Sequence, residues 1–165
     1  MTLFRDSHKL TSKVIAMFTS LAPEGPPPLV LEPNDQAPRL ARGFVAERFA
    51  GWGIKDDYVG RLVVCELVTN AYRHGGGPIV VRVLRDECDG LPVIEVWDGG
   101  EGRPVVRPQD YAAVSGRGLQ LMAEIVHEWG VRPLNEGGNV VWAGCGSDIA
   151  ARAGPARPVG SSGAW

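Results

Sequence analysis

The chain has 165 residues, of which 44% are hydrophobic and 22% charged, and its formal net charge is −2. These values predict one globular domain with a real core and give no support for direct binding to nucleic acid or to an anionic membrane. No apolar run approaches the roughly 20 residues that span a bilayer. The three cysteines (Cys65, Cys88 and Cys145) lack the CxxC spacing of zinc sites, so we expect reduced thiols in a cytoplasmic protein.

The first 28 residues are expected to form an extension to this domain. Leu10, Val14 and Met17 follow helical spacing and predict a short amphipathic helix, which would pack on the domain or on a partner. Four prolines between Ala22 and Pro28 predict a linker after this helix.

The domain itself is expected over residues 29–146, beginning with a short strand at Leu29–Leu31. A first long helix would start from a cap at Asn34 or Asp35 and run to about Ala50. Its expected buried positions are Leu40, Phe44, Val45 and Phe49. A second helix would be capped by Asp56 or Asp57 and end at the glycine run 75–77.

Beyond the glycine run the periodicity changes to that of strands. The expected strands are Ile79–Leu84, Val93–Trp97, Glu128–Pro133 and Asn139–Ala143, with a helix between the second and third of them. Residues 147–165 are rich in Ala, Gly, Pro and Ser and predict a disordered tail. This order predicts the α+β class: a two-layer α/β sandwich with a mixed, mostly antiparallel sheet and helices on one face.

The second helix carries a narrow polar stripe on an otherwise apolar surface. Glu66, Asn70 and Arg73 recur at i, i+4 and i+7, which places them within roughly 60° of one another around the helix axis. A stripe of this kind is often simply solvated. If it faces inward, a carboxylate and an amide need polar partners, so the alternative is a cavity that holds a polar ligand.

Two glycine-rich segments follow this helix. In the first, Asp98 stands at the end of a strand and precedes Gly100 and Gly102. Such an aspartate either bonds its own turn or accepts a hydrogen bond from a ligand amine. In the second, Gly116 and Gly118 flank the start of a helix, where free backbone N–H groups favour phosphate.

Taken in this order, the three segments resemble the motifs of the GHKL superfamily, whose Bergerat-type ATP-binding fold is shared by histidine kinases and gyrase-type ATPases. Residues 66–74, Glu-Leu-Val-Thr-Asn-Ala-Tyr-Arg-His, resemble its N box. Residues 98–102, Asp-Gly-Gly-Glu-Gly, resemble its DxGxG box, and residues 116–119, Gly-Arg-Gly-Leu, its GxGL box. The short connection between the last two boxes resembles the anti-sigma-factor serine/threonine kinase branch, and the resemblance spans Leu29–Cys145.

The resemblance implies ATP and Mg²⁺ as ligands and gives each motif residue a role. Glu66 would be the general base and Asn70 the Mg²⁺ ligand, and Arg73 would add charge near the phosphates. Asp98 would bind the adenine amino group. The pocket and phosphate positions implied in this way are Gly100, Gly102, Gly116, Arg117, Gly118 and Leu119.

The resemblance also implies partners. In this kinase branch a serine on a small STAS-type anti-anti-sigma protein accepts the phosphate, a sigma factor competes for binding, and a homodimer is expected. One departure concerns the last strand, where the family often carries a threonine near the adenine. Val140 is expected to take its place here, which would remove a hydroxyl from the adenine end.

Three functional hypotheses follow. The first is an ATP- and Mg²⁺-dependent serine/threonine kinase that also sequesters a sigma factor. The alternative is a catalytically silent or weak nucleotide-binding module that regulates transcription or signalling through partner binding. The third, a sensor histidine kinase fragment, is disfavoured because no pair of dimerisation helices with an acceptor histidine fits in the chain.

Overall fold

The computed structural model describes residues 12–17, 26–101 and 118–146. After a helical segment over residues 12–17, the elements in chain order are β1 (Leu29–Leu31), α2 (Ala37–Gly51), α3 (Tyr58–His74), β2 (Ile79–Arg85), β3 (Pro92–Asp98), α4 (Gly118–Ile125), β4 (Glu128–Pro133) and β5 (Asn139–Gly144). Each strand and long helix expected from the sequence is present, with bounds that differ by at most a few residues.

The strands form one sheet in the order β1-β2-β3-β5-β4. Its four strand pairings are all antiparallel, so the described strands include no parallel pair of the kind that a mixed sheet would contain. The register places Asp98 opposite Asn139 and Trp97 opposite Val140. The ends of β3 and β5 that flank the predicted site are therefore side by side.

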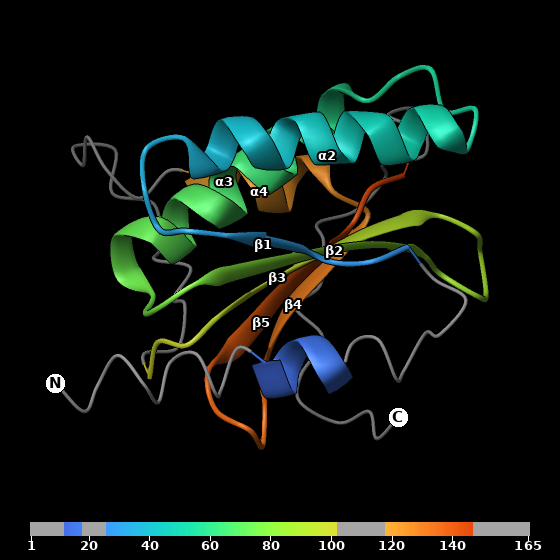
Figure 1. Ribbon diagram of the computed structural model, residues 1–165. Helices are drawn as coiled ribbons and strands as arrows, with labels where there is room; N and C mark the ends of the chain where they lie inside the picture. Colours follow the sequence, from blue (N-terminus) through green and yellow to red (C-terminus); the bar gives the residue numbers. More distant parts are fainter. Residues whose placement is uncertain (1–11, 18–25, 102–117, 147–165) are drawn as a thin grey trace, which may run out of the picture.

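The helices α2, α3 and α4 cover one face of this sheet (Figure 1). The main core lies between them, where Val63, Leu67 and Val68 of α3 meet Val96 of β3 and Met122 of α4. This arrangement confirms the predicted two-layer α/β sandwich. Burial of such aliphatic side chains stabilises the fold by about 1.5–3 kcal/mol each.

The segment of residues 12–17, which we call the N-terminal helical segment, lies on the opposite face of the sheet (Figure 1). Its Val14 is fully buried in a second, smaller cluster with Val80, Trp97 and Val140. These three strand residues alternate with residues of the main core, as the two-residue period of a strand requires. The helix predicted around Val14 thus packs on the domain in this structure.

The start and the buried face of α2 differ from the sequence prediction. Leu40 is 53% exposed, while Ala37 and Ala41 are completely buried. Small side chains let the helix backbone come close to its neighbours, and the leucine one position away then points to solvent. Gln36 is the N-cap residue and makes no side-chain cap bond; Asn34 Oδ1 instead accepts the Gln36 N–H at 2.9 Å.

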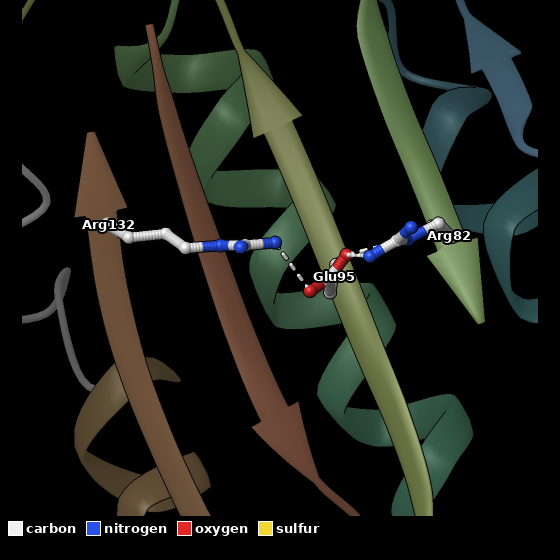
Figure 2. A network of polar contacts seen from close by, with 3 residues as sticks. All are labelled: Arg82, Glu95 and Arg132. Carbon is white, nitrogen blue, oxygen red and sulfur yellow. Dashed lines mark hydrogen bonds and ion pairs between the residues drawn. The ribbon is translucent and has the colours of Figure 1, made fainter. Parts of the chain in front are cut away.

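The sheet face opposite the helices also carries a buried ionic cluster (Figure 2). Glu95 of β3 lies between two arginines and is 7% exposed. Its Oε2 is 2.6 Å from Arg82 Nη2, and its Oε1 is 2.7 Å from Nη2 of Arg132, whose side chain crosses β5. Because both carboxylate oxygens are engaged, the cluster links β2, β3 and β4 across the sheet.

The three cysteines form no disulfide. Within the described ranges, no helix is long and apolar enough to cross a membrane.

Candidate nucleotide site

The polar stripe of α3 is half-buried at Glu66 and Asn70 and exposed at Arg73. Six other residues of this helix are buried, whereas Glu66 and Asn70 are half-buried. They lie one helical turn apart on the same side of α3. Arg73, one turn further on, is exposed near the helix C-terminus, as is His74, and cations are favourable at that end. The stripe thus runs from half-buried positions at Glu66 and Asn70 to solvent at Arg73.

The side-chain amide nitrogen of Asn70 has no hydrogen-bond partner among the described residues. Its Nδ2 is buried and unpaired with respect to the part of the chain that the structure describes. A buried polar group without a partner costs about 1–3 kcal/mol. Since the nitrogen and oxygen of an amide exchange by rotation about χ2, the same position can present a donor to a phosphate or an acceptor to a cation. The amide is therefore suited to hold a polar ligand.

Asp98 ends β3 on the helix-covered side of the sheet and is 7% exposed. Its Oδ1 accepts the Gly100 N–H at 2.8 Å. Burial raises the pKa of the Asp98 carboxyl, and backbone N–H groups of Gly100 and Gly76 partly offset this effect by stabilising the carboxylate. The aspartate thus does bond its own turn, and such a buried carboxyl can also accept a hydrogen bond from an amine.

A set of closely packed glycines, which we call the glycine junction, joins the end of α3 to the end of β3. It consists of Gly75, Gly76, Gly99 and Gly100. The Gly99 N–H donates to Gly76 O at 2.7 Å, and the Gly75 N–H closes α3 on Ala71 O at 3.0 Å. A Cβ on Gly75 would lie only 2.5 Å from Asp98 Oδ1. The absence of side chains is what brings the N-box helix against Asp98.

Asn139 belongs to this site, although the sequence prediction did not include it. It is 4% exposed, lies opposite Asp98 in the β3–β5 ladder, and donates from Nδ2 to Gly100 O at 3.0 Å. The expectation for Val140 is corrected, because its side chain is buried with Trp97 on the opposite face of the sheet. Neighbouring strand residues point to opposite faces, so Val140 cannot stand beside Asp98. The sequence did contain one signal for Asn139, which is a polar residue at the start of the last predicted strand.

The remaining predicted positions are only partly described. Gly102, Gly116 and Arg117 lie outside the described residues. Gly118 and Leu119 form the first turn of α4, which packs beside α3. The structure therefore brings Gly75 and Gly76, which directly follow the N box, against the start of the DxGxG box, and it places α4 next to α3.

The sequence was compared with known protein families. The family described as a histidine kinase-like ATPase domain matches residues 31–144, which is more than half of the chain. The chain belongs to this family. Membership confirms the resemblance to the GHKL superfamily and implies that the domain binds ATP. No curated protein is significantly similar to the sequence.

One solved structure with similarity to this ATPase domain is the crystal structure of the RsbU and RsbW domains of Rv1364c from Mycobacterium tuberculosis. The two sequences are 22% identical, and the TM-score is 0.47. The alignment covers 73% of this chain and 32% of the other, so this chain spans about a third of the length of that protein.

Proposed function

We propose that the protein is an ATP- and Mg²⁺-dependent serine/threonine kinase of the anti-sigma-factor type. The observation that carries the proposal is the pair formed by Glu66 and Asn70, half-buried one turn apart on α3, with the Asn70 amide nitrogen buried and unpaired among the described residues. Membership of an ATPase domain family supports nucleotide as the ligand. The carboxylate beside the amide favours phosphoryl transfer over binding alone.

Asn70 fits a role as the protein ligand of Mg²⁺. The described residues contain no cluster of three or more His, Cys, Asp or Glu side chains that could enclose a metal. Mg²⁺ commonly takes only one or two protein oxygens and keeps waters and phosphate oxygens as its other ligands. When bound, the ion would neutralise negative charge on the phosphates.

Asp98 would select the base. Its carboxyl is buried and fixed by the Gly100 N–H, which leaves acceptor capacity for the exocyclic amino group of adenine. A guanine presents an oxygen at the same position, which a carboxylate repels. Asn139 would hold the Asp98 turn closed by its bond to Gly100 O.

Glu66 would act as the general base. Its carboxylate would accept the proton of the acceptor serine hydroxyl while that oxygen bonds to the γ-phosphorus and ADP leaves. We propose that the serine belongs to a STAS-type anti-anti-sigma protein and that a sigma factor competes for the same regulator. A homodimer stays a prediction of the resemblance.

The test is phosphotransfer from [γ-³²P]ATP to purified STAS-type proteins of the source organism, with wild type and Glu66→Gln. The variant should bind ATP with unchanged affinity and lose transfer by a factor of about 10²–10⁴. Glu47→Gln, at an exposed glutamate of α2, is the matched control and should transfer normally. Transfer by Glu66→Gln at the wild-type rate would refute the base assignment, and ATP binding without any transfer by wild type would favour the silent binding module.

A further inference from the structure

Trp97, the residue that precedes Asp98, lies on the opposite face of the sheet, behind the proposed adenine site. Trp97 is 1% exposed, and its indole Nε1–H donates to Gly137 O at 3.1 Å. Gly137 belongs to the turn between β4 and β5, 40 residues further along the chain. The ring therefore ties the end of β3 to a turn that is distant in sequence.

The contact between this turn and the Asp98 backbone is very close. Gly138 has φ +76°, a left-handed conformation that favours glycine, and a Cβ there would collide with Asp98 O and lie 2.7 Å from Trp97 Nε1. The next residue, Asn139, donates to Gly100 O. A shift of this turn would therefore move the groups that hold the Asp98 carboxylate.

The N-terminal helical segment closes the same region from outside. Val14 is fully buried against the cluster of Val80, Trp97 and Val140. Trp97 and Val140 are a directly paired couple in the β3–β5 ladder, adjacent to the pair of Asp98 and Asn139. The N-terminal helical segment thus packs on the sheet directly behind Asp98 and Asn139, the two residues at the proposed adenine site.

We propose that Trp97, covered by Val14, is a positioning residue for adenine recognition. It acts through the backbone of the 137–139 turn and through Asp98, without touching the nucleotide. This inference rests on the proposed ATP site and extends it to the back of the sheet. A change that displaces the N-terminal helical segment from the sheet should therefore weaken the preference for adenine, although the segment does not contact the nucleotide.

The experiment compares the affinity for ATP with that for purine riboside triphosphate, which has hydrogen in place of the amino group. Trp97→Phe should lower the affinity for ATP about five- to tenfold and leave the affinity for the analogue unchanged. The ratio of the ATP affinity to the analogue affinity should therefore fall toward the ratio measured for Asp98→Ala. Trp142→Phe is the matched control, because this tryptophan packs against the same cluster but pairs with Glu95 in the β3–β5 ladder and lies over Gly130 of β4, away from the Asp98 end. It should leave the ratio unchanged.

A second pair of variants tests the role of the N-terminal segment. Val14→Asp should reduce the same ratio, whereas Ala16→Asp, on the exposed side of the segment, should not. Retained binding of the analogue shows that each variant is folded. An unchanged ratio in Trp97→Phe, or an equal loss for both nucleotides, would overturn this inference alone. Failure of wild type to bind ATP, or to prefer it over the analogue, would overturn the proposed adenine site as well.

Discussion

Replacing Gly75 by alanine should weaken ATP binding, although none of the residues proposed to contact the nucleotide is itself replaced. The new Cβ would lie 2.5 Å from Asp98 Oδ1 and 2.5 Å from Ala71 O, whereas ordinary contacts begin at 3.4 Å. Overpacking of this kind costs about 1–3 kcal/mol. Ala71 O is held by the last hydrogen bond of α3, so the Asp98 carboxylate is the group that should move.

The assay combines urea denaturation with calorimetric titration of ATP in the presence of Mg²⁺. Gly75→Ala should lose about 1–3 kcal/mol of unfolding free energy and at least about tenfold in ATP affinity. Gly76→Ala is the matched control, because its Cβ would come no closer than 3.4 Å to any atom. If Gly75→Ala folded and bound ATP like wild type, the glycine junction would not control the position of Asp98.

Two further predictions concern stability. Burial raises the pKa of the Asp98 carboxyl in the folded protein above 3.8. The favourable contribution of the protonated carboxyl to the stability of the fold is therefore fully present below that pH, and it is lost as the pH rises through the folded-state pKa. Wild type should therefore lose stability relative to Asp98→Asn as the pH rises from below 3.8 to neutrality, and parallel stability curves would contradict this. Glu95→Gln should cost about 3 kcal/mol in urea denaturation, because Arg82 is 9% exposed and loses its carboxylate. Asp57→Asn breaks only a solvent-accessible pair with Arg61 at 3.7 Å and should cost less than about 1 kcal/mol; equal losses would refute this reasoning.

The fold could be predicted from local patterns because the strands alternate regularly and glycines or turn residues end most elements. The predicted bounds of β1 and β4 agree with the structure, and α3 ends at Gly75 as expected. The burial of α2 could not be predicted as well. The larger side chain made Leu40 the expected core residue. In the structure, the close approach of the helix layer to the sheet buries the smaller Ala41 instead.

The candidate site was predicted only where its residues belong to one local motif. Glu66 and Asn70 share a helix, so their spacing alone placed them together. The pairing of Asp98 with Asn139 depends on the strand register, which the sequence does not specify, and a shift by one residue exchanges the two faces. Val140 was therefore assigned to the wrong face. The role of Gly75 needed the distance between α3 and β3.

The most direct measurement is calorimetric titration of ATP with Mg²⁺ into wild type and Asp98→Ala under identical conditions. The account predicts saturable one-site binding by wild type and its loss in the variant, because the buried carboxyl is the proposed adenine acceptor. Equal binding by both proteins would show that Asp98 does not recognise the base. Absence of binding by wild type would contradict the proposed nucleotide site itself.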